Sequence, residues 1–161
     1  MAGSTQLLIG IGAAVSACAV LALAIRPLMI RRRLYLYRRY IRDFAVEREQ
    51  LEAKFFDLAS QTGEPSGWRW DGIEFDSSVS FVRDRSSGRV SALVEATIDL
   101  APPEADAASE DGHEVQHATA VFHVRRGHWT TKGRIFYNMS PREALHRFHD
   151  RYEALSVASA P

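Results

Sequence analysis

The chain has 161 residues, of which 46% are hydrophobic and 25% are charged, and it contains one cysteine. This composition is typical of a globular domain and excludes a disordered chain, a disulfide framework and a Cys-based zinc module. The formal net charge is zero, but residues 1–42 hold seven arginines and no acidic residue. Residues 43–161 therefore carry 13 basic and 20 acidic side chains, an acidic excess that argues against nucleic-acid binding.

The first predicted element is an uncharged stretch of 19 residues, 7–25, rich in Leu, Ile, Val and Ala. As a helix it would be about 28 Å long, close to the thickness of the hydrocarbon core of a bilayer. We therefore predict an uncleaved transmembrane anchor over residues 1–30, with the lipid bilayer as its partner through 7–25. A signal peptide cleaved after Ala24 and a lipoprotein signal at Cys18 are the alternatives. The arginines that follow and the apolar run beyond Cys18 argue against both.

The orientation of this anchor follows from the distribution of arginine. None of the seven arginines precedes the apolar stretch, and all seven lie within the 17 residues after it. The positive-inside rule then places the N-terminus outside and the rest of the chain in the cytoplasm.

Residues 31–62 are predicted to form a basic juxtamembrane and amphipathic helix. Apolar residues recur at a spacing of three or four from Leu34 to Leu58, with Arg48 in one position of the stripe. The stripe fits either packing on the protein's own sheet, which we favour, or a coiled-coil seam between copies. Arginine and tyrosine are both suited to the headgroup layer of a membrane. The basic segment serves either as a topology signal or to recognise a specific anionic lipid. The predicted membrane-interface residues are Arg31, Arg32, Arg33, Tyr35, Tyr37, Arg38, Arg39 and Tyr40.

The body, residues 63–156, begins with a switch to the alternating pattern of β-strands. Short strands are predicted at Ile73–Phe75 and Val79–Arg83, followed by a turn at Asp84–Gly88 and a long strand at Val90–Leu100. After an acidic loop over 101–112, we expect a hairpin. Its strands are Ala118–Val124 and Trp129–Asn138.

Ser140-Pro141-Arg142-Glu143 predicts a helix start, because Ser, Pro and Glu occupy the positions of a capping box. An apolar stripe continues this helix to Leu155, and residues 157–161 form a frayed tail. The predicted fold class is α+β: an N-terminal transmembrane helix, a long amphipathic helix, and a four- to five-stranded antiparallel sheet. The C-terminal helix packs on one face of this sheet.

The segment His113-Glu-Val-Gln-His117 matches the H-E-x-x-H motif of zinc hydrolases, with His123 at the spacing of a third ligand. The motif requires a helix, but this segment leads directly into a predicted strand. Residues four apart on a strand lie about 13 Å apart, too far to share one zinc ion. We therefore predict no metal site, no cofactor and no catalytic residue, and we keep the zinc hydrolase as an alternative.

The stretch from Gly67-Trp-Arg-Trp70 through Phe81-Val-Arg-Asp-Arg85 to Ala118-Thr-Ala-Val-Phe122 and Gly127–Ala144 resembles a group of small bacterial membrane-anchored proteins. The resemblance covers residues 67–150 and implies no function. The order of a helix and a curved sheet is also similar to cystatin-like and NTF2-like folds.

The sequence therefore indicates a single-pass protein of the inner membrane that is not an enzyme. We expect its cytoplasmic body to bind a membrane-protein partner or a second copy of the chain. A cone-like domain that holds a small apolar ligand is the first alternative, and the zinc hydrolase is the second.

Overall fold

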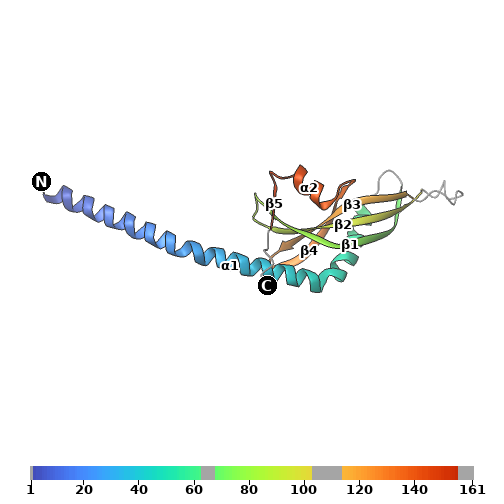
Figure 1. The fold of residues 1–161 in the computed structure, drawn as a ribbon, viewed down its shortest axis with the longest axis horizontal. Coiled ribbons are helices and arrows are strands. Elements are labelled where there is room, and N and C mark those ends of the chain that lie inside the picture. Colours follow the sequence, from blue (N-terminus) through green and yellow to red (C-terminus); the bar gives the residue numbers. More distant parts are fainter. Residues whose placement is uncertain (1, 63–67, 103–113, 156–161) are drawn as a thin grey trace. The chain divides into compact units, whose positions relative to one another are not determined.

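The structure is a computed structural model of the 161-residue chain that describes residues 2–62, 68–102 and 114–155 (Figure 1). Within these ranges, side chains are described from Ile25 onward, apart from those of Ile30 and Thr62. The chain divides into two compact units, Met1–Arg39 and Tyr40–Pro161. The long helix α1, Ala2–Thr62, contributes residues to both units, whereas every strand belongs to the second.

The first unit consists of the N-terminal part of α1, which continues through Pro27 without ending. Among the described residues, none of the helices contains a stretch that is long and apolar enough to cross a membrane. The predicted span covers residues 7–25, and the side chains of residues 7–24 lie outside the described part of the structure. The transmembrane helix therefore stays a prediction.

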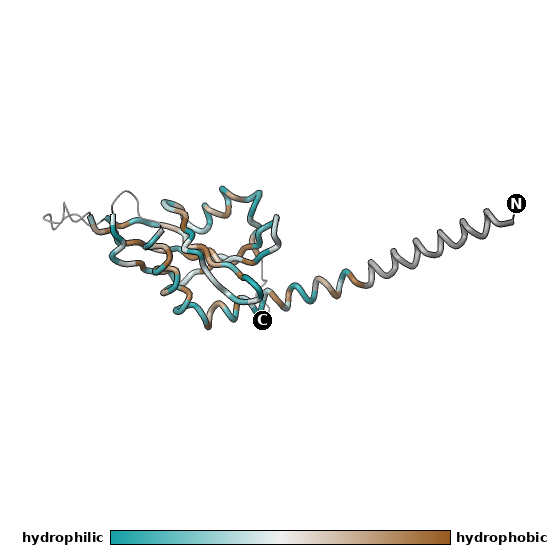
Figure 2. Tube along the Cα trace, turned by 180° about the vertical axis from the view of Figure 1, so that it is seen from behind, coloured by the Kyte–Doolittle hydropathy of each residue, from teal (hydrophilic) through white to brown (hydrophobic). Residues whose placement is uncertain are grey.

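The second unit contains a five-stranded antiparallel sheet with the strand order β4-β3-β2-β1-β5. The strands are β1 Arg69–Asp84, β2 Val90–Ala101, β3 Glu114–Arg125, β4 His128–Tyr137 and β5 Tyr152–Ala154. Hydrophobic (brown) and hydrophilic (teal) residues are intermixed along the body in Figure 2, and in β2 nine of the twelve residues are buried. The unbroken run of buried residues at 90–94 is typical of a strand with both faces covered, and the predicted α+β class is confirmed.

One face of the sheet is covered by the C-terminal part of α1. Phe44, Leu51, Phe55 and Ala59 are each at most 5% exposed on the side of α1 that meets the sheet. The Phe44 ring lies 4.8 Å from that of Trp129 and 5.6 Å from that of Phe122 between centroids, in edge-on geometry. The prediction that the apolar stripe packs within the chain is thus confirmed for this part of α1, where each buried Phe or Leu side chain contributes about 1.5–3 kcal/mol.

Two predicted short strands form a single strand, β1, with a register shift between Phe75 and Val79. The shift leaves backbone carbonyls without strand partners. Arg48 of α1 donates hydrogen bonds to the carbonyl oxygens of Asp76 and of Ser77, the latter at 3.0 Å. The charged position in the apolar stripe thus satisfies the backbone of a β-bulge.

The other face of the sheet carries the short helix α2, Pro141–Arg147, whose capping box is present as predicted. Our prediction that this helix extends to Leu155 is wrong. The chain leaves the helix after Arg147, and Tyr152–Ala154 form strand β5 beside β1. Tyr152, 4% exposed, still joins the apolar cluster under α2, because β5 places it there. Helices therefore cover both faces of the sheet.

Candidate functional site

The predicted membrane-interface residues lie on α1, and most of them are exposed. Arg31, Arg32, Arg33, Arg38 and Arg39 are exposed, and Tyr35 is 70% exposed. Tyr37 and Tyr40 are half-buried, and the backbone carbonyl of Tyr40 accepts a hydrogen bond from Trp129 Nε1 at 2.7 Å. Arg31 to Arg39 belong to the first unit, whereas Tyr40 belongs to the second. Tyr40 thus has a structural role in the body that the sequence did not indicate.

The H-E-x-x-H segment lies in a strand over its described part. Glu114 to His117 belong to β3, where His117 pairs with Thr97 of β2, while His113 lies outside the described residues. Among the residues that the structure describes, no group of three or more His, Cys, Asp or Glu side chains could hold a metal ion. Residues 114–117 are therefore in a strand and not in the helix that the H-E-x-x-H motif of zinc hydrolases requires.

The α2-side face of the sheet contains an open cavity of about 290 Å³, which we call the cationic cavity. It lies beside the turn between β1 and β2 and is lined by residues of all five strands or of the turns next to them. Its walls include Ser91, Val121 and Tyr152, which are at most 5% exposed. Its acidic, basic and histidine residues are Asp84, Arg89, His123, Lys132, Arg134 and Arg151.

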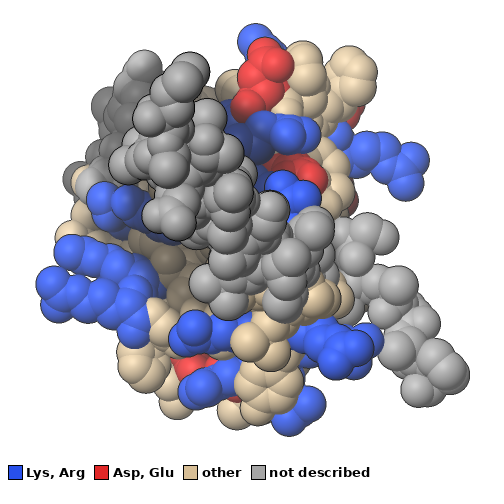
Figure 3. Space-filling view, turned by 90° about the vertical axis from the view of Figure 1, so that its left-hand side faces the viewer, with Lys and Arg blue, Asp and Glu red and all other residues tan. Residues whose placement is uncertain are grey.

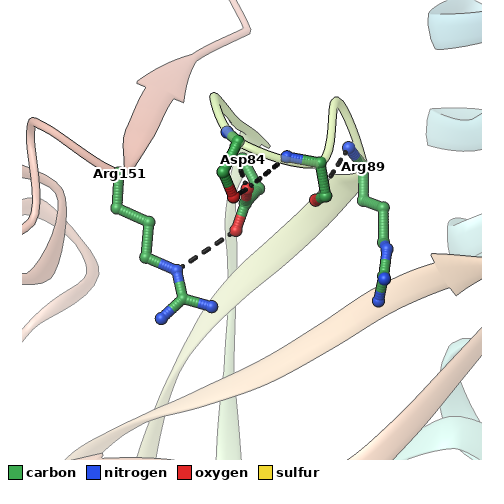
Figure 4. A network of polar contacts seen from close by, with 5 residues as sticks. Asp84, Arg89 and Arg151 are labelled. Carbon is green, nitrogen blue, oxygen red and sulfur yellow. Dashed lines mark hydrogen bonds and ion pairs between the residues drawn. The ribbon is translucent and has the colours of Figure 1, made fainter.

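Asp84 organises one side of the cationic cavity (Figure 4). Its Oδ1 accepts hydrogen bonds from the backbone N–H groups of Ser86 and Ser87, at 3.0 and 2.9 Å, and from the Ser86 hydroxyl. Its Oδ2 accepts one from Arg151 Nε at 3.1 Å. The hydrogen bonds, above all from Ser86, hold the pKa of the carboxyl far below its usual range, against the opposing effect of burial. Asp84 is therefore an ionised acceptor whose two oxygens are occupied by the protein.

The cations of the cavity are less completely paired. Arg151 is bonded to Asp84 through Nε, and Figure 4 shows its two terminal nitrogens directed to the same side as the Arg89 side chain. The Arg134 guanidinium lies 5.0 Å from the centroid of the Phe136 ring, in cation–π contact. Within the described part of the chain, the side chains of Arg89 and Lys132 have no carboxylate partner. The cavity thus holds four fixed positive charges against one carboxylate.

The imidazole of His123 lies among the cations of this cavity. Burial lowers the pKa of its imidazole, and the positive charges of Lys132, Arg89 and Arg125 lower it further. On the face of the molecule seen in Figure 3, Lys and Arg side chains (blue) are more prominent than Asp and Glu side chains (red). The acidic excess of the body, counted along the sequence, therefore does not describe the potential at this site.

Strand β4 contributes Lys132 and Arg134 on either side of Gly133. Gly133 has a φ of +67°, and a Cβ there would lie 2.8 Å from the backbone N of Ala59 in α1. Its backbone N–H donates to Thr131 Oγ1 at 3.1 Å, next to a register shift between β3 and β4. A close approach of helix and strand thus fixes the segment that presents both cations.

Sequence reasoning missed this cavity altogether. Its cations come from separate segments: the β1–β2 turn, β4, and the residue before β5. No motif links them, and the only local signal was the Asp84–Gly88 turn, which the structure confirms. Strand pairing brings them together.

The fold and the cavity define an α+β domain with a cationic cavity on the side of the sheet that carries α2. Comparison with protein-family models, curated proteins and solved structures finds no match to this chain.

Proposed function

We propose that this chain is a single-pass membrane-anchored protein whose cytoplasmic α+β body is a non-enzymatic binding module. In this proposal, residues 7–25 cross the inner membrane, and the body assembles with a membrane-protein partner or a second copy. The observation that carries the proposal is the surface of α1 between residues 25 and 35. Five of the seven exposed large apolar residues in the described part of the chain lie there.

These apolar residues alternate with arginines. Leu28, Met29 and Leu34 are 68%, 54% and 48% exposed, and Arg31 to Arg33 lie between them. Exposed apolar side chains next to cations have an unfavourable contact with water, which a bilayer interface removes. Each arginine near an anionic leaflet contributes about 1 kcal/mol of attraction, and Tyr35 fits the same layer. This pattern supports a helix that emerges from a membrane at this point.

The packing and the sequence of the body argue against the alternatives to partner binding. Aromatic rings of α1, β1, β3 and β4 fill the space between the helix and the sheet. A cone-like cavity for an apolar ligand would need that space, so we do not propose one. The sequence offers no convergent set of catalytic residues, and binding is therefore the function that we propose.

Membrane extraction of the full chain tests the anchor. We expect the protein to stay in the pellet after alkaline carbonate and high salt and to be released by detergent. Release by salt alone would contradict a spanning helix and leave only electrostatic attachment.

Cysteine labelling tests the orientation, because Cys18 is the only cysteine in the chain. In a Cys18→Ala background, Ser4→Cys is expected to react with an impermeant thiol reagent in cells whose inner membrane is intact. Gln61→Cys, at an exposed position of α1, is expected to react only after permeabilisation. The reverse pattern would place the body outside the cytoplasm.

Crosslinking in intact membranes tests the binding role. The proposal expects a defined adduct, either with another protein or with a second copy. Recovery of the monomer alone would count against it.

A further inference from the structure

We propose that the cationic cavity binds a phosphate monoester, a tetrahedral dianion, between Arg89, Lys132, Arg134 and Arg151. This proposal goes beyond the function proposed above and does not depend on it, since all the residues involved belong to the body.

The charge balance of the cavity favours an anion over a neutral ligand. Four fixed cations face a single carboxylate, and both oxygens of that carboxylate already accept hydrogen bonds from the protein. Asp84 therefore positions Arg151 rather than neutralising the rest of the site. The excess positive charge is self-repulsive, although water screens these exposed side chains, and a bound anion relieves the repulsion.

The cations are arranged for an anion that accepts hydrogen bonds from several directions. Arg89 approaches from the β1–β2 turn, Lys132 and Arg134 from β4, and Arg151 from the chain before β5. Ser87 and Ser91 line the same cavity. A phosphate monoester has three terminal oxygens, which suit this arrangement better than the two oxygens in one plane of a carboxylate.

The charge of the ligand follows from the same count. The positive excess of the cavity is three, so a dianion gains more Coulomb energy than a monoanion at the same position. The same cations act on His123, where burial and then the positive charges of Lys132 and Arg89 lower the pKa of the imidazole. These side chains therefore direct their field into the cavity, where the phosphate group would lie.

Isothermal titration calorimetry on the full chain in a nonionic detergent tests the proposal, with inorganic phosphate and glycerol 3-phosphate as probes at low ionic strength. Both are expected to bind at one site per chain, and more tightly than acetate. Loss of one charged hydrogen-bond donor is expected to weaken binding about tenfold or more in Arg89→Gln and in Lys132→Gln. The matched control is the double variant Arg142→Gln/Arg147→Gln on α2, which removes two charges outside the cavity.

A lipid with a phosphate monoester headgroup offers the same chemistry as a soluble ester. Flotation with neutral vesicles containing phosphatidic acid, compared with phosphatidylglycerol, distinguishes the two sources. If glycerol 3-phosphate competes with phosphatidic acid for the wild-type chain but not for Lys132→Gln, the lipid is a ligand of the cavity. Binding of the soluble esters without any preference for phosphatidic acid would identify a soluble ligand.

Two results would overturn the proposal. One is that neither phosphate nor glycerol 3-phosphate binds to the wild-type chain. The other is that the α2 double variant weakens binding as much as the cavity variants, because the attraction would then be a general effect of charge. Circular dichroism of each variant shows whether it is folded. A loss of binding in an unfolded variant counts for neither outcome, so Lys132→Arg, which keeps the charge, is measured beside Lys132→Gln and is expected to retain binding.

Discussion

Gly133 provides the most direct test of how α1 fixes strand β4, which contributes Lys132 and Arg134 to the cavity. A Cβ at this position would lie 2.8 Å from Ala59 N, 2.9 Å from the Leu58 carbonyl carbon and 3.0 Å from Ala59 Cα. All three are backbone atoms of a helix, so no side chain can rotate away to make room. Gly133→Ala must therefore move α1 or β4, in addition to placing an alanine at a φ of +67°.

The expected magnitude has two parts. A left-handed φ costs a non-glycine residue about 1–2 kcal/mol, and overpacking of a well-packed contact costs about 1–3 kcal/mol more. Gly133→Ala is thus expected to lower the free energy of unfolding by about 2–5 kcal/mol.

Gly88 is a matched control for the first part. It has the same φ, +67°, but nothing lies within 4 Å of a Cβ built there. Gly88→Ala is therefore expected to lose only the backbone part, about 1–2 kcal/mol. The difference between the two variants measures the contact between helix and strand.

Urea denaturation of the full chain in detergent, followed by tryptophan fluorescence, gives both values. Trp129 packs against Phe44 of α1, so its emission responds to separation of helix and sheet. Equal destabilisation of the two variants would refute the close approach of α1 to β4.

Three further predictions concern the cavity and its supports. Because its folded-state pKa is lowered, ionised Asp84 stabilises the protein fully above about pH 4 and progressively less as the pH falls further. Urea midpoints should therefore fall more between about pH 5 and about pH 3 in the wild type than in Asp84→Asn, and parallel curves would contradict this. Sulfate, whose charge is constant, should bind more tightly on going from about pH 7.5 to about pH 5.5, because a bound anion favours protonated His123. Calorimetry of His123→Gln should show no such increase in sulfate affinity, and an increase that persists in this variant would mean that another group is protonated. Ser140→Ala removes the N-cap of α2 and is expected to cost about 1 kcal/mol by thermal unfolding, whereas an unchanged midpoint would mean that the cap contributes nothing.

The local elements could be predicted from the sequence because their signals lie within a few residues. The alternation over Val90–Leu100 predicted β2, and Ser140 with Glu143 predicted the start of α2. The Asp84–Gly88 turn was correct for the same reason, since Asp84 bonds to the N–H groups two and three residues later.

The end of α2 was not predictable in this way. The apolar spacing from Leu145 to Leu155 fits a helix, but the chain forms strand β5 at Tyr152–Ala154. Contacts far apart in the sequence decide between the two: β5 pairs with Val82–Asp84, and Arg83 bonds to Glu153 at 2.5 Å. These contacts outweigh a helical preference of a few tenths of a kcal/mol per residue.

The sequence by itself determined the antiparallel strands, the capping box and the basic, aromatic segment of α1, because period and composition are local properties. Only the tertiary structure decided what Arg48 and the cavity cations do. Arg48 looked like a charged defect in an apolar stripe, and it bonds instead to the carbonyl groups of a bulge in β1. Arg89, Lys132 and Arg151 became neighbours through the register of five strands. Side chains from distant segments meet only when the backbone pairing is complete, so no local sequence pattern predicts such a site.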